Sequence, residues 1–185
     1  MNVADLLGLP PRRLTKLDVA RRQLKMATRM FLRGDDPIPI HTLACAAQDV
    51  LRDLLRAKGV AQASAIKDSD FIRPERQREY RDFINRPRDF LKHADREPDG
   101  LLDFIPEYSP FVLQDAAHMY EKLTGRMLRE GRAFMLWFMF EYPGLLKSGP
   151  FAEEIKYLRG TIGLTRSRKT FLELLDRNDF CPDSD

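Results

Sequence analysis

The sequence has few of the residues and motifs that usually identify an enzyme. Only two of its 185 residues are cysteine and three are histidine. Cys45 and Cys181 lie far apart and match no metal-binding or redox spacing, so neither a metal centre nor a disulfide framework is indicated. The chain has no P-loop, no glycine-rich dinucleotide fingerprint, no Gly-x-Ser-x-Gly elbow and no His-Glu-x-x-His motif. We therefore expect no cofactor and none of the enzyme classes that these motifs define.

A long apolar segment is also missing. The longest uninterrupted apolar run, residues 133–140, is far too short to span a bilayer. The first eight residues carry an acid and no basic region, so they do not match a secretory signal. We expect a cytoplasmic, reduced protein with no membrane partner.

The composition is that of one folded domain. Hydrophobic residues make up 43% of the chain and charged residues 32%, the profile of a globular protein. The length is enough for one domain with a substantial core and short for two. We expect a single domain over residues 1–185, with residues 1–13 and 179–185 peripheral. The net charge of +3 demands no nucleic-acid partner but permits a local basic stripe.

Apolar residues recur at helical spacing along most of the chain, which predicts an all-α bundle of about five or six main helices. The expected helical segments are residues 15–33, 40–58, 75–84, 109–124, 128–142, 152–159 and 167–177. Thr15 and Asp18 fit a capping pair, and Ser109 before Pro110 fits an N-cap. Residues 101–105 are the one plausible strand.

Two of these segments indicate how the bundle packs. Small residues at 44–47 allow close helix approach, so the helix over residues 40–58 is expected near the centre. Residues 133–140 are apolar on every side, which predicts either a helix enclosed by its own chain or a helix that covers a subunit interface. A homodimer is the second of these alternatives.

Two basic or polar features away from the centre of the chain have ordinary structural interpretations. The helix over residues 15–33 carries Arg22, Lys25, Arg29 and Arg33 on its polar side, which we interpret as a solvated face rather than a phosphate-binding stripe. His41 lies one helical turn before Cys45, but two ligands do not make a zinc site. We expect His41 to be a capping or surface histidine.

The stretch over residues 85–99 concentrates charge, two prolines and a histidine between the two apolar halves. Asn85 and Pro87 predict either a kink or a new helix start. Within it, residues 88–93 read Arg-Asp-Phe-Leu-Lys-His, an arginine and a polar residue followed after three residues by a histidine. This pattern resembles the signature of HEPN domains, helical-bundle proteins common in prokaryotic toxin and defence systems, many of which are metal-independent RNases.

The resemblance to HEPN domains implies a role for each residue. Arg88 would stabilise phosphate charge, His93 would act as general acid or base, and Asp89 would orient the pair. Imidazole titrates near neutral pH, and a guanidinium holds phosphate oxygens bidentately, so the chemistry is reasonable. Asp89 and His93 are four residues apart and share a helical face. Arg88 and His93 are five apart and diverge on a straight helix, so their convergence requires a helix start or a second protomer.

A second resemblance covers more of the chain. Residues 89–98, together with the helix start at His41, are similar to an uncharacterised prokaryotic helical family whose signature reads Asn-Phe-Phe-Lys-His-Ala-Asp-Arg-Asp-Pro. This chain differs from that signature at positions 89, 91 and 97. The resemblance implies no activity, and it draws attention to Lys92, His93, Asp95 and Arg96 in place of Arg88.

Two functions remain open from the sequence. The first is an RNA-binding or metal-independent RNase module of HEPN type, with RNA and a second copy of the chain as partners. The second is a non-enzymatic helical protein that acts by association, in which residues 92–96 cap a helix end and form surface ion pairs. A shared electropositive cleft between Arg88 and His93 would favour the first function.

Overall fold

The computed structural model describes residues 8, 10–161 and 167–177, and within them the fold is all-α. These residues form seven α-helices and no strand. The α-helices are α2 (Lys16–Arg33), α3 (Pro37–Ala57), α4 (Gln77–Lys92), α5 (Ser109–Thr124), α6 (Arg129–Glu141), α7 (Pro150–Thr161) and α8 (Arg168–Asp176). Three short 3₁₀ helices accompany them: η1 (Pro74–Arg76), η2 (Pro106–Tyr108) and η3 (Pro143–Leu145). The predicted all-α bundle is confirmed, whereas residues 101–105 form no strand.

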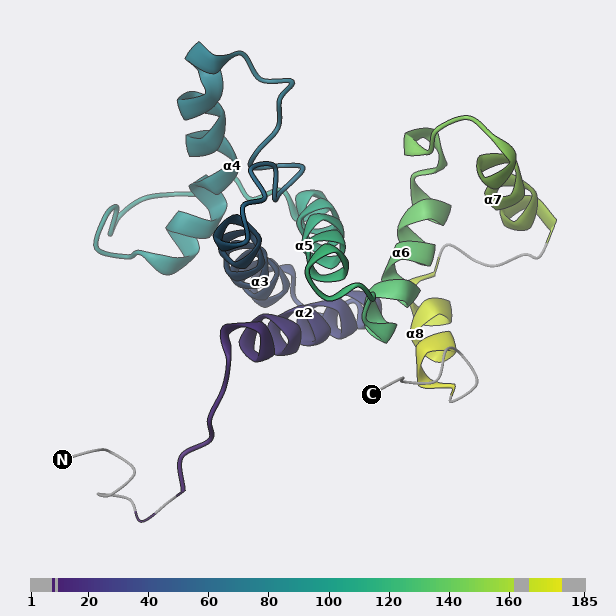
Figure 1. Ribbon diagram of the computed structural model, residues 1–185, viewed down its shortest axis with the longest axis horizontal. Coiled ribbons are helices and arrows are strands. Elements are labelled where there is room, and N and C mark those ends of the chain that lie inside the picture. The colour runs from purple at the N-terminus through teal and green to yellow at the C-terminus, as the bar shows by residue number, and fades with distance from the viewer. Residues whose placement is uncertain (1–7, 9, 162–166, 178–185) are drawn as a thin grey trace.

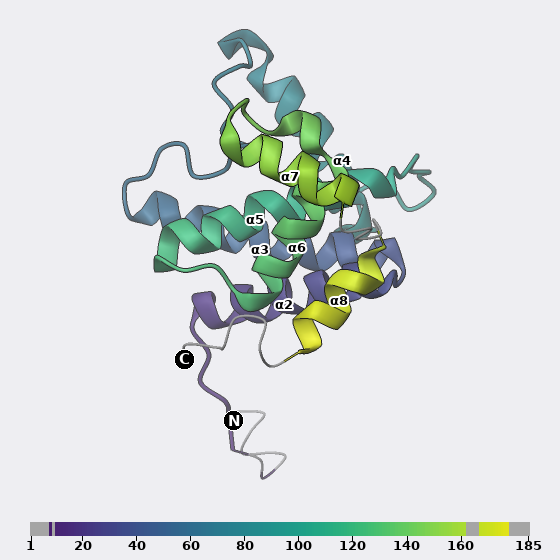
Figure 2. The same ribbon diagram turned by 90° about the vertical axis from the view of Figure 1, so that its right-hand side faces the viewer.

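The centre of the molecule is a layer of three helices. α3 packs against both α2 and α5, and α4 lies beside α3 at one side of this layer (Figure 1). At the other side, α6 and α8 pack against each other and against α2, which Figure 2 shows from a second direction. Ala44 and Ala47 of α3 are completely buried, as their small size predicted. None of the helices in the described ranges is long and apolar enough to cross a membrane.

Local signals in the sequence set the ends of α2. The Thr15 hydroxyl accepts a hydrogen bond from the Asp18 backbone N–H, and the Asp18 carboxylate accepts one from the Thr15 N–H, both at 3.0 Å. This reciprocal capping box satisfies two backbone donors that the helix leaves free. Gly34 ends the helix in the left-handed conformation, at a φ of 79°. The predicted capping pair is therefore confirmed.

Other helix boundaries differ from the predicted ones. α3 begins at Pro37 rather than residue 40, because the Asp36 carboxylate accepts a 2.8 Å hydrogen bond from the Ile38 N–H and caps the helix. Ser109 is not an N-cap, since it already has helical backbone angles and its buried hydroxyl contacts His41 instead. α4 continues through Pro87 without a new start. At each of these places the sequence contains residues that can form either a turn or a helix cap. Contacts with other parts of the fold determine which of the two forms.

The apolar helix α6 is enclosed by its own chain. Phe134 is fully buried, and its ring lies 5.5 Å from that of Phe31 on α2. Trp137 packs edge-on against Phe31, and Phe140 packs against Phe171 of α8. Of the two interpretations of residues 133–140, the structure supports the internal helix for these aromatic side chains. The other interpretation, a homodimer interface, is not tested by the structure and stays a prediction.

Truncating the ring of Phe134 tests the placement of α6 in the core. We expect Phe134→Ala to lower the free energy of unfolding by about 3–5 kcal/mol, because it leaves a large cavity. Phe71→Ala is the matched control, since the Phe71 ring is 97% exposed, and it should change stability by less than about 0.5 kcal/mol. Urea unfolding measures both, and equal losses would contradict the core position of Phe134.

Candidate functional site

The guanidinium of Arg88 is committed to an internal ion-pair network. Its Nη1 lies 2.7 Å from Asp49 of α3, and its Nε and Nη2 lie 2.8 Å and 2.6 Å from Asp89. Asp49 also pairs with Lys67, a lysine that is only 8% exposed. Asp89 is approached in turn by Arg96, at 3.5 Å. Arg88 therefore faces two carboxylates and ties α4 to α3.

His93 lies at the end of α4 and shares a hollow with Asp89 and Arg96 of that network. It is the C-cap of the helix, and its backbone N–H donates a 2.9 Å hydrogen bond to the Asp89 carbonyl. A hollow of about 610 Å³ opens beside it. Its described lining consists of Asp82, Phe83, Arg86, Asp89, Phe90, His93, Arg96 and Glu97. Arg88 is not in this lining, so one copy of the chain brings Asp89 and His93 to a common hollow but not Arg88.

The charges around this α4 hollow show no excess of positive charge. Two arginines and a histidine face three carboxylates in its lining. Lys92 and Asp95, which the second resemblance singled out, are exposed, and neither forms an ion pair with a described residue. The electropositive cleft that would favour RNA cleavage at Arg88 and His93 is therefore not formed within a single chain.

His41 is fully buried, so the prediction that it caps a helix or lies at the surface is wrong. Its Nδ1 lies 3.1 Å from the Ser109 hydroxyl, and its Nε2 lies 3.4 Å from the Cys45 sulfur. Phe104 and Tyr108 cover the ring, with the Phe104 centroid 5.3 Å away. The cover comes from residues more than sixty positions further along the chain, which local spacing does not reveal.

Burial keeps this His41–Cys45 pair electrically neutral. It lowers the pKa of His41 to about 4, helped by the positive charge of Lys67. Burial also raises the pKa of the Cys45 thiol to about 12. A thiolate nucleophile needs the opposite shift, so the pair is a packing element rather than a catalytic dyad. Nowhere in the described ranges do three or more His, Cys, Asp or Glu side chains form a cluster that could hold a metal ion.

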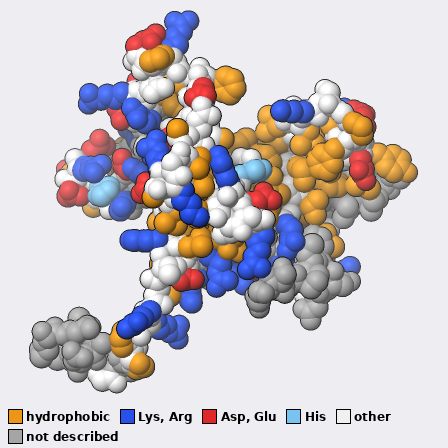
Figure 3. Space-filling model, viewed as in Figure 1, with side chains coloured by type: hydrophobic (Ala, Val, Ile, Leu, Met, Phe, Trp, Pro, Cys, Tyr) orange, Lys and Arg blue, Asp and Glu red, His pale blue; other side chains and the backbone are white. Residues whose placement is uncertain are grey.

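A second hollow, between α2 and the start of α6, carries a strong excess of positive charge. We name it the α2–α6 basic pocket, and its volume is about 320 Å³. Its described lining consists of Arg21, Arg22, Lys25, Tyr120, Arg126, Met127, Leu128, Arg129, Glu130 and Arg132. Six of these side chains are basic and one is acidic. Figure 3 shows Lys and Arg gathered over α2 and the neighbouring connection to α6.

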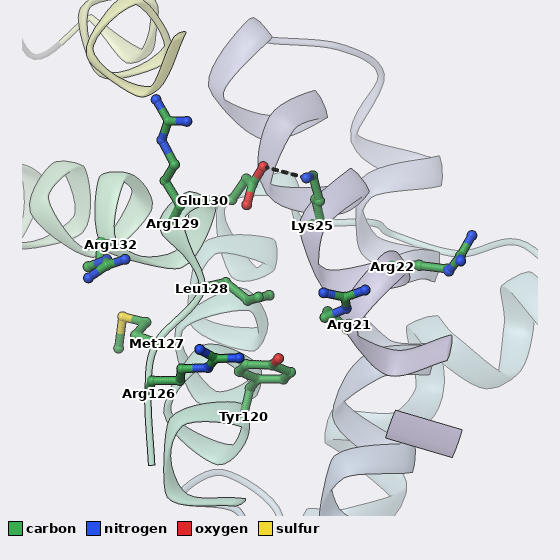
Figure 4. Close-up of a pocket in the computed structure, with 10 residues that line it drawn as sticks. All are labelled: Arg21, Arg22, Lys25, Tyr120, Arg126, Met127, Leu128, Arg129, Glu130 and Arg132. Carbon is green, nitrogen blue, oxygen red and sulfur yellow. Dashed lines mark ion pairs between the residues drawn. The ribbon is translucent and has the colours of Figure 1, made fainter. Parts of the chain in front are cut away.

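The lone carboxylate of this pocket is already neutralised. Glu130 is buried, and its Oε1 lies 3.3 Å from Lys25 and 3.0 Å from Arg29. Arg21 and Arg22 form no ion pair with any residue that the structure describes. In Figure 4 the Arg21 and Arg126 side chains extend into the space between the two walls, whereas Arg22 points outward. Within the described lining, six basic residues therefore stand beside one carboxylate, which is itself paired.

Backbone and side-chain donors at the start of α6 add to this field. α6 begins at Arg129, and no side chain among the described residues caps it. Its first backbone N–H groups therefore have no side-chain acceptor, and they form the positive end of the helix dipole beside the pocket. The Nε atoms of Arg129 and Arg132 are buried and have no hydrogen-bond partner within the described chain. Such groups are suited to an anion.

Part of this pocket was visible in the sequence, and part was not. Lys25 belongs to the stripe that we interpreted as a solvated face, and Arg29 and Arg33 of that stripe are used in ion pairs with Glu130, Asp176 and Asp35. The other wall comes from three arginines at a spacing of three, at positions 126, 129 and 132. That spacing could have indicated a basic surface, but only the fold shows that these arginines lie opposite α2.

Comparison of the chain with protein-family models, with curated proteins and with solved structures finds no match. The two resemblances drawn from residues 88–98 therefore stay predictions.

The buried state of His41 makes stability depend on pH. The pKa of the buried His41 is about 4, so the folded protein keeps this imidazole neutral down to about pH 4, whereas an unfolded histidine takes up a proton near its ordinary pKa of 6.5. Stability is therefore lost as the pH falls from about 6.5 to 4, by about 3 kcal/mol at the lower end.

Urea unfolding of the wild type and of His41→Gln at several pH values measures this loss. The variant should be less stable at pH 7 and should show a flatter profile between pH 6.5 and 4.5. His118→Gln, at an exposed histidine of α5, is the control and should keep the wild-type profile. A wild-type slope that survives in His41→Gln would contradict the assignment.

Proposed function

We propose that this protein is an RNA-binding module that holds phosphate groups of the RNA in the α2–α6 basic pocket. The observation that carries the proposal is the charge of this pocket, whose described lining holds six basic residues and one carboxylate. That carboxylate, Glu130, is itself paired with Lys25 and Arg29. Phosphate is the anion that such arginine clusters bind best, because a guanidinium donates two parallel hydrogen bonds to its oxygens.

The pocket supports binding of phosphate rather than reading of bases. Its one aromatic residue, Tyr120, is only 6% exposed and offers no open ring on which a base could stack. Contacts to phosphate carry no sequence information, so we expect affinity without strong sequence preference. The choice of RNA rests on the resemblance of residues 88–93 to HEPN domains, while the pocket supplies the phosphate chemistry.

The geometry favours binding without cleavage. For the RNase role, Arg88 would have to leave Asp49 and Asp89 or be replaced by an arginine of a second protomer. Breaking partly buried ion pairs of this kind costs free energy that the bound RNA would have to supply. His93 is a helix C-cap beside a hollow whose described lining has two arginines and three carboxylates, which does not favour a phosphate group there.

A second candidate function is association with another protein through the free side of α4. The observation that favours it is an apolar hollow of about 540 Å³ between α4 and residues 102–111. Phe83 and Ile105 in its lining are 76% and 64% exposed. Clustered exposed apolar side chains mark interaction sites more often than solvated surface. This candidate is the non-enzymatic alternative, and it is compatible with RNA binding elsewhere.

Charge reversal in the pocket tests the RNA-binding proposal. We expect Arg21→Glu and Arg126→Glu each to weaken the binding of a fluorescent single-stranded RNA by about tenfold or more, and to reduce the salt dependence of the affinity. Arg78→Glu is the matched control, because Arg78 lies on α4 with a side chain that is 92% exposed. Fluorescence anisotropy over a salt series measures all three. An equal loss in Arg78→Glu, or no RNA binding by the wild type, would overturn the proposal.

The cleavage question has its own test. We expect the wild type and His93→Ala to leave labelled RNA intact to the same degree in the presence of a metal chelator. The physical reason is the engagement of Arg88 by two carboxylates. Gel analysis of the RNA over several hours measures this. Cleavage by the wild type that His93→Ala abolishes would instead establish the HEPN-type RNase.

A further inference from the structure

We propose that the α2–α6 basic pocket recognises a terminal phosphate of the RNA rather than an internal phosphodiester. This inference rests on the proposed function and specifies the chemical group that the pocket binds. It is carried by three features of the same hollow: the number of charges around it, the free donors at the start of α6, and the absence of an open aromatic surface in its lining.

The charge around the pocket exceeds what one internal phosphate needs. An internal phosphodiester carries one negative charge, whereas a terminal phosphate carries about two at neutral pH and presents three acceptor oxygens. The basic residues of the lining outnumber its one acid by five. Arg21 enters from α2 and Arg126 from the opposite wall (Figure 4), so a compact group with several negative oxygens can contact both walls at once.

The start of α6 lies at the edge of the same hollow and adds backbone donors there. The helix begins without a side-chain cap, and within the described chain the buried Nε atoms of Arg129 and Arg132 have no acceptor. The backbone N–H groups of the uncapped helix start form the positive end of the helix dipole, which favours a bound oxyanion at this end of the hollow. Another donor of Arg129 is already used, since its Nη2 donates a 2.5 Å hydrogen bond to the Arg177 carbonyl. This contact holds the guanidinium in place.

The shape of the pocket favours a terminal phosphate of the RNA over an internal one. The hollow is about 320 Å³, and an internal phosphate would have to enter it with a nucleoside on each side. Stacking of bases on an open ring would favour that arrangement, but Tyr120 is buried. A terminal phosphate enters end-on and leaves its single attached nucleoside at the rim. The structure does not distinguish a 5′ from a 3′ terminal phosphate, so the experiment includes both.

The test compares four RNAs of one sequence that differ only at their ends: hydroxyl at both ends, 5′-monophosphate, 5′-triphosphate and 3′-phosphate. Their affinities for the full chain are measured by competition against one labelled RNA. We expect at least one terminally phosphorylated RNA to bind about tenfold or more tightly than the hydroxyl-ended RNA. Arg21→Glu should remove this preference, and Arg78→Glu should retain it.

The outcomes separate the inference from the proposed function. Equal binding of all four RNAs, weakened alike by Arg21→Glu, would overturn the terminal-phosphate inference and leave RNA binding in place. No binding of any RNA would overturn both. Free GTP is added as a competitor at the same concentration as the RNA. Displacement of the triphosphorylated RNA by an equal concentration of GTP would also overturn the inference, because the pocket would then recognise a free nucleotide.

Discussion

The buried carboxylate of Asp115 is the interaction on which the α3–α5 side of the molecule depends. It is 2% exposed on α5, and it accepts hydrogen bonds from the Gln48 amide at 2.7 Å, the Ser64 hydroxyl at 2.5 Å and the Ala65 N–H at 2.8 Å. A buried carboxylate is tolerated only when such partners replace water. The three bonds join α5 to α3 and fix the turn at residues 64–68 against both helices.

That turn determines what Arg88 can do. Because the turn is fixed, Lys67 lies against Asp49, and the shared Asp49 holds Arg88 on the α3 side of α4. The arginine that the HEPN-like pattern assigns to phosphate is thereby used to attach a peripheral helix. Basic residues gather instead around the α2–α6 basic pocket, where the one acid of the described lining is already paired. The proposed phosphate-binding pocket and the HEPN-like pattern therefore lie on different surfaces of one chain.

The sequence predicted what depends on neighbouring residues. The capping box of Thr15 and Asp18 followed from short-range spacing. The apolar pattern of α6 predicted a covered helix but left open whether its own chain or a second copy covers it. His41 was misjudged because its cover and its partner Ser109 lie 63 to 68 positions away in the chain. The basic pocket needed the same information, since its walls come from segments about a hundred residues apart. Helical spacing identifies a basic or apolar face, but the fold decides what lies opposite it. Predictions for Cys181 and residues 179–185 fall outside the described residues.

Hydrogen–deuterium exchange of the full chain, with and without a 5′-phosphorylated RNA, tests the location of the binding site most directly. The account predicts slower exchange of the backbone amides at residues 129–131, which start α6 without a side-chain cap, and in the neighbouring part of α2. Exchange along α4 should stay unchanged, because its arginine is held by Asp49 and Asp89. Slower exchange along α4 and residues 93–96, with none at residues 129–131, would contradict the account.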